Sequence, residues 1–168
     1  AIFLRYNTLS FDENFLRQCL YQTLHSPYIT YTQRNVRADV LRLVQATVTY
    51  APDCLAIPTN DKGNPVFKLD QLAPMNGFTH DNAHEAMADV EATIHIAKVI
   101  KDGAPEIWQN VMKSCRKSTA IETVMTTDVL AMTETYFNKP YSWLVTYCGQ
   151  NPDYDAQIAV FDLQYDPA

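Results

Sequence analysis

An acid and a base lie five positions apart in the segment of residues 82–101, NAHEAMADVEATIHIAKVIK, which otherwise has the pattern of an amphipathic helix. Successive helical residues are rotated by about 100°, so His84 and Asp89 converge only if His84 stands at the helix start. The residues that share the helical face of Asp89 are of the core type: Thr93, Ile96, Ala97 and Ile100. A carboxylate on such a face is costly unless it is paired or bound to a metal ion. Because imidazole titrates near neutral pH, the pair suits a metal ligand and a general base.

A second acid, Asp12, follows a strand-like stretch and opens the next predicted helix. This position favours an N-cap aspartate, and it also suits a metal ligand presented at the end of a strand. The other two residues have ordinary structural interpretations as well. His84 can be a plain histidine at a helix start, and Asp89 can lie at the edge of the apolar stripe beside a backbone partner. Asn82 and Glu85, spaced N-x-x-E, are typical of a capping box there.

Zinc chemistry is not supported by these residues. His84 and Glu85 begin like the H-E-x-x-H motif of zinc metalloproteases, but residue 88 is alanine where a second histidine is needed. His80 lies four positions before His84 and can share a helical face with it. No further histidine or cysteine lies nearby to complete a structural zinc site.

The apolar pattern and the turn signals predict an α/β arrangement followed by a β-rich segment. A short strand is expected over residues 1–7, and the proline-rich connection of residues 52–69 contains a turn at 60–64. A β-hairpin is expected from residues 141–149 and 156–165. Helices are expected over residues 10–24, 35–51, 69–77 and 82–102, with one more helical or linking segment over 104–124.

The composition narrows the class of protein. The 168 residues carry a formal net charge of −6, which is unusual for a nucleic-acid binder but compatible with an acidic metal site. No apolar run is long enough to span a bilayer, and we expect no secretory signal. The cysteines are therefore expected to be free thiols in a reducing compartment, the cytoplasm. They are widely scattered, at Cys19, Cys54, Cys115 and Cys148.

The stretch YNTLSFD at residues 6–12, with NAHEAMADVEAT at residues 82–93, resembles the second and third motifs of the DnaQ-like DEDDh 3′–5′ exonucleases. Within that family it is most similar to the exodeoxyribonuclease I branch, over residues 1–103. The resemblance implies the C-terminal part of an RNase H-like exonuclease domain at 1–103. A linking segment at 104–126 and the start of a Src-homology-3-like barrel at 127–168 are expected to follow.

Carried over from that family, Asp12 and Asp89 match metal ligands and His84 matches the general base. The resemblance implies two divalent cations, Mg²⁺ or Mn²⁺, about 3.5–4 Å apart, and carboxylate oxygens suit both ions. It also implies hydrolysis of single-stranded DNA from the 3′ end to nucleoside 5′-monophosphates, in DNA repair. The partners it implies are single-stranded DNA and a single-stranded-DNA-binding protein, without a membrane.

Two features depart from the family pattern. The family's first motif, Asp-x-Glu on an earlier strand, supplies two further acidic ligands, and none of the eleven residues before Asp12 is acidic. Arg5 replaces a glycine that the family has just before the Tyr-Asn pair. We therefore expect an internal piece of a longer enzyme that is inactive on its own. Marginal solubility is also expected, because a sheet without its first strands exposes an edge and an apolar face.

Several further residues are candidates for supporting roles. Asn7 and Phe11 flank Asp12 and are candidates to position the terminal nucleotide. Lys68 is a candidate phosphate contact, and a solvated surface lysine is the alternative. Arg37 and Asp39 form either a supporting pair for the site or an ordinary exposed helix pair. Three tyrosines have two interpretations each: they stack on bases, or they pack within the protein, which is the default. They are Tyr28, Tyr31 and Tyr50.

Three hypotheses of function follow. The first is a metal-dependent 3′–5′ exonuclease on single-stranded DNA. The second is a non-catalytic nucleic-acid-binding or structural piece whose acids cap helices, and it predicts that Asp12→Ala and Asp89→Ala leave divalent-metal binding unchanged. The third is a related exonuclease that acts on RNA. The length of the 52–81 connection and the β-rich segment after it favour DNA.

Overall fold

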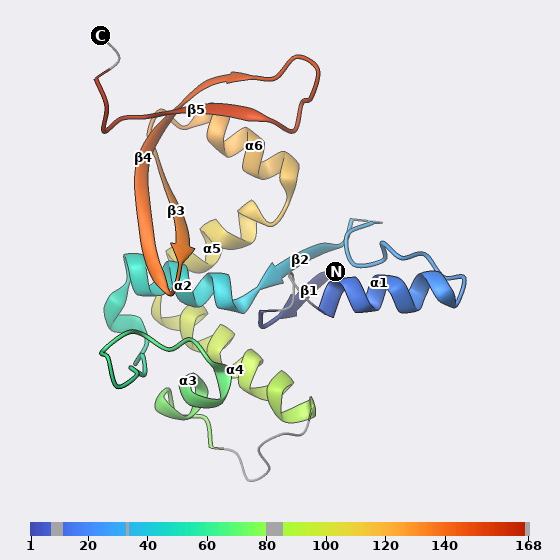
Figure 1. The fold of residues 1–168 in the computed structure, drawn as a ribbon, viewed down its shortest axis with the longest axis vertical. Helices are drawn as coiled ribbons and strands as arrows, with labels where there is room; N and C mark the ends of the chain where they lie inside the picture. Colours follow the sequence, from blue (N-terminus) through green and yellow to red (C-terminus); the bar gives the residue numbers. More distant parts are fainter. Residues whose placement is uncertain (8–11, 33, 80–85, 167–168) are drawn as a thin grey trace. The chain divides into compact units, whose positions relative to one another are not determined.

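The computed structural model describes residues 1–7, 12–32, 34–79 and 86–166. The contacts within the chain divide it into two units, Ala1–Val111 and Met112–Ala168. This division falls inside the 104–126 segment that we expect to link two domains. Figure 1 shows the elements of both units, coloured along the chain from blue at the N-terminus to red at the C-terminus.

Unit 1 begins with two parallel strands, β1 (Ile2–Arg5) and β2 (Val36–Asp39), with helix α1 (Asp12–Gln22) between them in the sequence. The expected helix over 35–51 is therefore wrong in its first part, because helix α2 spans only Val40–Tyr50. Asp39 is extended and accepts a hydrogen bond from the Leu41 backbone N–H, so it is the N-cap that starts α2. A four-residue strand ahead of an N-cap is too short for its periodicity to be separated from that of a helix.

Helix α1 confirms the helix expected there, but its apolar residues are largely exposed. Phe15 is 59% exposed and Leu24, just after the helix, is 95% exposed. The buried residue of α1 is instead a charged one, Glu13, which is 5% exposed. Polar contacts of the first turn therefore hold α1 against the rest of the unit.

The core of unit 1 lies around helix α4 (Ala86–Gly103), which packs against both α2 and helix α3 (Leu69–Met75). Leu55 and Phe67, from the connection between α2 and α3, add buried apolar side chains. The buried positions recur every three or four residues along α2 and α4, as expected for helices with one packed face. The fully buried side chains are Val40, Leu43, Val44, Thr47, Leu72, Ile96 and Ile100.

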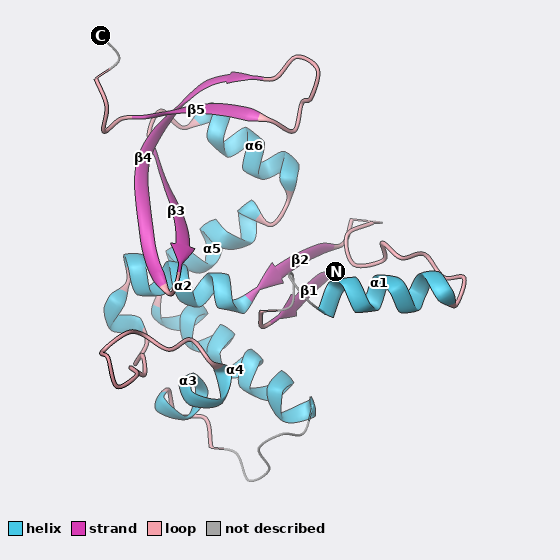
Figure 2. Ribbon diagram, in the orientation of Figure 1, coloured by secondary structure: helices cyan, strands magenta, loops and turns pink. Residues whose placement is uncertain are grey.

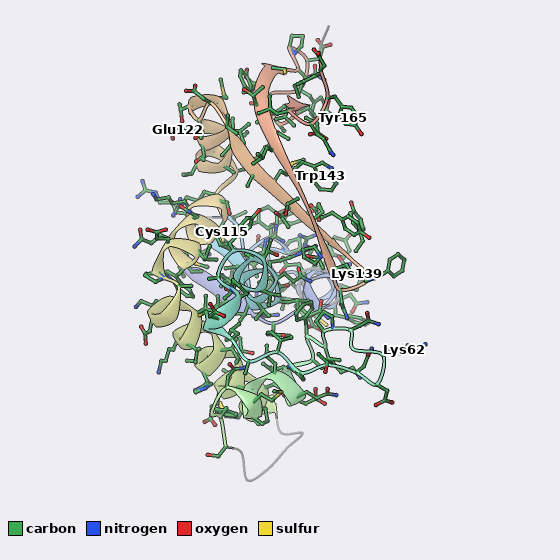
Figure 3. The ribbon with its side chains drawn as sticks, turned by 90° about the vertical axis from the view of Figure 1, so that its left-hand side faces the viewer. Lys62, Cys115, Glu122, Lys139, Trp143 and Tyr165 are labelled. Carbon is green, nitrogen blue, oxygen red and sulfur yellow. The ribbon has the colours of Figure 1, made fainter. Side chains whose placement is uncertain are left out.

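The long connection from α2 to α3 contains the predicted turn. After a short 3₁₀ helix, η1 (Pro52–Cys54), the side chain of Asn60 accepts hydrogen bonds from the backbone N–H groups of Lys62 and Asn64. Gly63 has φ +75°, a left-handed conformation that glycine adopts without strain. Lys62 stands at the tip of this turn and points away from the rest of the unit (Figure 3).

Ile96→Ala is expected to lower the free energy of unfolding by about 2–5 kcal/mol, because the side chain is fully buried and its removal leaves a cavity. Ile94 provides a matched control on the same helix, since it is 43% exposed. Ile94→Ala is expected to cost less than about 1 kcal/mol. Urea-induced unfolding measures both losses. Equal losses for the two variants would contradict a core between α2, α3 and α4.

Unit 2 contains helix α6 (Lys117–Thr126) and an antiparallel sheet of three strands in the order β3-β4-β5 (Figure 2). The strands are β3 (Leu130–Tyr136), β4 (Lys139–Gln150) and β5 (Ile158–Asp162). Helix α5 (Pro105–Ser114) crosses the division between the units. The expected hairpin corresponds to β4 and β5 and is confirmed.

Strand β3 was not among the elements expected from the sequence. Its turn into β4 uses Phe137 and Asn138, which both have positive φ values of 50° and 62°. Two consecutive positive φ values are typical of the tight turns in β-hairpins. Phenylalanine is an unusual residue for such a turn, which normally uses glycine or asparagine, so the usual hairpin signal is missing.

The cysteines and the helices of the described chain agree with the expectations from composition. The four cysteines are free thiols, as predicted. Burial raises the pKa of the Cys54 and Cys115 thiols. None of the described helices has the length and apolarity needed to cross a bilayer.

Candidate active site

The two candidate metal ligands both lie in the first turn of a helix and are both exposed. Asp12 is the first residue of α1, and Asp89 lies in the first turn of α4. Neither carboxylate forms a hydrogen bond or an ion pair with a described residue. Thr93 donates a hydrogen bond of 2.6 Å to the backbone oxygen of Asp89 and leaves the carboxylate available.

The expectation that Asp89 sits on a buried face is corrected by this position. Thr93, Ile96, Ala97 and Ile100 are buried as expected. In the first turn of α4 the buried side chain is Ala88, at 3% exposure, while the neighbouring residues Met87 and Val90 are exposed like Asp89. The Asp89 carboxylate therefore reaches solvent, and desolvation does not by itself require a partner for it.

The remaining catalytic candidate lies outside the described residues. His84 belongs to residues 80–85, as does the expected capping box of Asn82 and Glu85. Phe11 is likewise outside the described residues. The role of His84 as general base therefore stays a prediction from the sequence, and the geometry of the site rests on Asp12, Asp89 and the residues that position them.

The donor chemistry of the two aspartates suits a hard divalent cation. Asp12 and Asp89 offer exposed carboxylate oxygens, the ligands that Mg²⁺ and Mn²⁺ prefer. Among the described residues, no group of three or more histidine, cysteine, aspartate or glutamate side chains is arranged to hold a metal ion. The described part of the chain thus supplies suitable ligands but not a complete set.

The chain just after β1 is held at Asn7 by Asp39. The Asn7 backbone N–H donates a hydrogen bond of 2.7 Å to Asp39 Oδ1, and the same oxygen accepts from the Leu41 N–H at 3.0 Å. Asn7 is exposed and has φ +56°, a left-handed conformation that asparagine tolerates. Buried Asp39 therefore fixes the end of β1 and the start of α2 together.

Asp39→Ala is expected to destabilise the protein by about 1–3 kcal/mol, because it removes an N-cap and leaves two backbone N–H groups without their acceptor. Asp39→Asn is the matched control, since an amide oxygen can still accept these hydrogen bonds. It is expected to lose less than half as much. Thermal unfolding of both variants checks this order, and an equal loss would show that the charge of Asp39 matters more than its hydrogen bonds.

Tyr6, the residue before Asn7, makes a second tertiary contact at the end of β1. Its hydroxyl donates a hydrogen bond of 2.5 Å to the backbone oxygen of Phe67. Burial raises the pKa of Tyr6 well above its usual value, and the charges of Asp39 and Asp70 raise it further. The hydroxyl therefore stays protonated at any physiological pH and keeps donating to Phe67.

Glu13, which the sequence analysis missed, is the centre of a polar cluster beside Asp12. Its Oε1 atom accepts from Thr30 Oγ1 at 2.6 Å, Arg37 Nη1 at 3.0 Å and Arg17 Nη2 at 3.5 Å. Burial raises the pKa of the Glu13 carboxyl, but the Thr30 hydrogen bond and the two arginine charges outweigh it and hold the pKa below its usual value. The Glu13–Arg17 spacing of four was the only local signal for this cluster.

The pairing expected for Arg37 is different from the one observed. Arg37 forms its ion pair with Glu13, while Asp39 accepts from backbone N–H groups instead. Tyr28, Tyr31 and Tyr50, for which packing was the default expectation, are all partly exposed, and the ring centroids of Tyr28 and Tyr31 lie 5.4 Å apart. Arg37 lies 4.5 Å from the Tyr31 ring centroid, and Arg17 lies 5.5 Å from it. Cation–π contact with the arginines therefore holds the Tyr31 ring at the surface.

The junction between α3 and α4 is fixed by Asn76. Its side chain donates to and accepts from the backbone of Ala56, at 2.8 and 2.9 Å. Its backbone oxygen lies 2.7 Å from His95 Nε2, and the His95 ring contacts Phe78. These contacts hold the chain after α3 at Asn76 and Phe78. Lys68, the candidate phosphate contact, is exposed at the N-cap of α3.

Comparisons with known proteins relate this chain to one group of enzymes. No protein-family model matches it. Exodeoxyribonuclease I of Escherichia coli strain K12 is 39% identical to it over 106 residues, which are 62% of this chain and 22% of the relative. The Haemophilus influenzae exodeoxyribonuclease I is 38% identical over 105 residues, with the same shares.

Solved structures agree with the sequence comparison. The crystal structure of E. coli exonuclease I in complex with a dA16 oligonucleotide matches 98% of this chain with a TM-score of 0.78 and 28% identity. A moderately thermophilic exonuclease I from Methylocaldum szegediense matches with a TM-score of 0.77 and 27% identity. The chain is a homologue of exodeoxyribonuclease I. It covers 36% of each of these two structures and 22% of the E. coli and H. influenzae relatives.

The likeness to exodeoxyribonuclease I confirms the expected fold class. The chain corresponds to the C-terminal part of the RNase H-like exonuclease domain followed by the start of the Src-homology-3-like region. Arg5, the departure from the glycine of exodeoxyribonuclease I, is half-buried at the end of β1, opposite Asp39 in the strand register. It forms no ion pair with a described residue.

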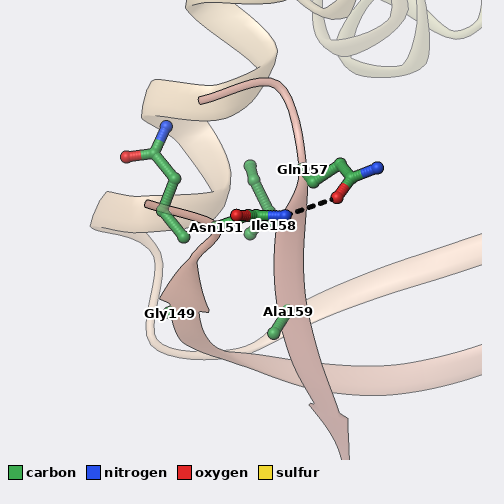
Figure 4. Close-up of a pocket in the computed structure, with 6 residues that line it drawn as sticks. Gly149, Asn151, Gln157, Ile158 and Ala159 are labelled. Carbon is green, nitrogen blue, oxygen red and sulfur yellow. Dashed lines mark hydrogen bonds between the residues drawn. The ribbon is translucent and has the colours of Figure 1, made fainter. Parts of the chain in front are cut away.

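A shallow pocket in the exodeoxyribonuclease I-like chain lies in unit 2, far from these carboxylates in the sequence. Asn151 donates a hydrogen bond of 2.7 Å to the side-chain oxygen of Gln157 across it (Figure 4). The lining holds amide and apolar groups without an acid, a base or a nucleophile, so we assign no chemistry to it. The lining residues are Gly149, Gln150, Asn151, Gln157, Ile158 and Ala159.

Proposed function

We propose that the natural protein that contains this chain is a 3′–5′ exodeoxyribonuclease that hydrolyses single-stranded DNA to nucleoside 5′-monophosphates in DNA repair. The observation that carries this proposal is the homology to exodeoxyribonuclease I across the segment that holds Asp12, His84 and Asp89. The structure adds support, because Asp12 and Asp89 present carboxylates without a partner among the described residues.

In this proposal Asp12 and Asp89 hold divalent cations, Mg²⁺ or Mn²⁺, two of them in the complete site. Bound cations of this kind supply an activated water and stabilise the leaving oxygen. His84 takes the proton of the attacking water, since neutral imidazole is a base of suitable strength. Asn7 and Phe11 position the terminal nucleotide, and Lys68 contacts a phosphate of the substrate.

The proposed partners follow from the same comparison. Structures related to this chain include E. coli exonuclease I with dA16 and dT13 oligonucleotides and an ExoI/SSB-Ct complex. We propose single-stranded DNA as the substrate of this protein and a single-stranded-DNA-binding protein as a partner. We place the protein in the cytoplasm, without a role for a membrane.

A second function, non-catalytic binding of nucleic acid, is the alternative to the exonuclease. The described residues contain no group of three or more potential metal ligands. Metal dependence and product formation separate the two functions.

The test uses the full natural protein with 5′-labelled oligonucleotides of DNA and of RNA. The expected result is Mg²⁺-dependent shortening of single-stranded DNA from its 3′ end, release of nucleoside 5′-monophosphates, and loss of activity with a chelator. Faster hydrolysis of the matched RNA would replace the proposal with the RNA exonuclease. Binding of DNA without any shortening would establish the non-catalytic role.

A further inference from the structure

Glu13 is the buried residue of a helix whose apolar side chains are largely exposed. It is 5% exposed, whereas Phe15 of the same helix is 59% exposed. Burying a carboxylate costs free energy unless charged or hydrogen-bonding partners compensate. Here three partners converge on one oxygen of Glu13, so the attachment of α1 depends on this carboxylate more than on apolar packing.

The partners of Glu13 come from different parts of unit 1. Arg37 belongs to β2 and lies opposite Phe3 of β1, so its ion pair ties α1 to the strands. Thr30 is buried in the connection that leads from α1 back to β2. Arg17 lies one turn further along α1, and its guanidinium forms an ion pair with Glu13 of the same helix. The first turn of α1 is therefore held to β2 and to the returning chain at one point.

Glu13 directly follows Asp12 in that first turn. The position of the Asp12 carboxylate relative to the strands thus depends on the contacts that Glu13 makes. Residues that orient metal ligands typically change metal affinity or activity about 10–100-fold when they are replaced. Arg37 and Thr30 act on Asp12 only through Glu13 and the helix backbone.

We propose that Glu13 is a positioning residue that fixes where Asp12 presents its carboxylate to a divalent cation. This inference rests on the proposed function, in which Asp12 is a metal ligand. It assigns to the Glu13 cluster a role in cation affinity, separate from its contribution to stability. Glu13 itself does not contact the cation or the DNA in this proposal.

The experiment measures the Mn²⁺ concentration that half-saturates the full natural protein in a calorimetric titration, together with the KM for single-stranded DNA. Glu13→Gln keeps the shape of the side chain and removes its charge. It is expected to raise that Mn²⁺ concentration about 10–100-fold and to change the KM for DNA less than about twofold. Asn14→Ala, at the next and exposed residue of α1, is the control and is expected to change neither.

Thr30→Val keeps the proposal testable if Glu13→Gln does not fold. It removes one hydrogen bond to Glu13 Oε1 and is expected to shift the Mn²⁺ dependence in the same direction by a smaller factor. Added to Glu13→Gln, it is expected to give no further shift, because both act through one carboxylate. A lower unfolding temperature with unchanged Mn²⁺ dependence, for either variant that folds, would overturn the proposal.

Asp12→Asn separates this proposal from the proposed function. If Asp12→Asn leaves the Mn²⁺ dependence unchanged, Asp12 is not a metal ligand and both proposals fail together. If Asp12→Asn raises it and Glu13→Gln does not, only the positioning role of Glu13 is wrong.

Discussion

Asp12→Asn and Asp89→Asn are each expected to lower kcat/KM on single-stranded DNA by more than about 100-fold, beyond the loss typical for a residue that only orients a metal ligand. Asparagine keeps the shape of the side chain but removes the negative charge that a divalent cation needs. Both residues are exposed in a first helical turn. Losing a favourable helix-dipole interaction there costs only about 0.3–1 kcal/mol, so the variants should remain folded.

The measurements are initial rates on a 5′-labelled oligonucleotide and calorimetric titration with Mn²⁺. Asp102→Asn is a matched control, because Asp102 is an exposed aspartate at the other end of α4. It should leave both the rate and Mn²⁺ binding unchanged. Unchanged Mn²⁺ binding in Asp12→Asn and Asp89→Asn would instead support the view that these acids only cap helices.

His84→Gln is expected to lower kcat about 10²–10⁴-fold, the usual contribution of a general base, while binding of single-stranded DNA is retained. The imidazole accepts a proton only in its neutral form, and its ordinary pKa is about 6.5. The wild-type rate should therefore fall toward low pH, where a general-base histidine is protonated. The variant should lose this dependence, because glutamine does not titrate.

A pH–rate profile from about pH 5 to 9, which spans the ordinary histidine pKa, checks this prediction with kcat and KM determined separately. His25→Gln is the control, since His25 is an exposed histidine just after α1. It should keep both the rate and its pH dependence. A profile for His84→Gln that is lower but has the same shape would show that another group accepts the proton.

The strongly periodic elements could be predicted from the sequence. Helix α4 shows a continuous stripe of apolar residues, and Gly77, with φ +85°, follows α3 where its glycine predicts a helix end. The β4–β5 hairpin is rich in β-branched and aromatic residues. Local preference and tertiary packing agree in these segments. The resemblance that pointed to exodeoxyribonuclease I also rests on contiguous stretches of sequence.

Tertiary structure alone decided the parts where local preference is weak or the partners are distant. Strand β2 exists because it pairs with β1 more than thirty residues away, and its four residues carry too little pattern to separate it from α2. The exposure of Asp89 was also decided there, because Ala88 and not Asp89 is the buried residue in the first turn of α4. Glu13 looks like an ordinary first-turn acid in the sequence. Its role as a buried anchor appears only because folding brings Thr30 and Arg37 from separate segments to the same carboxylate oxygen.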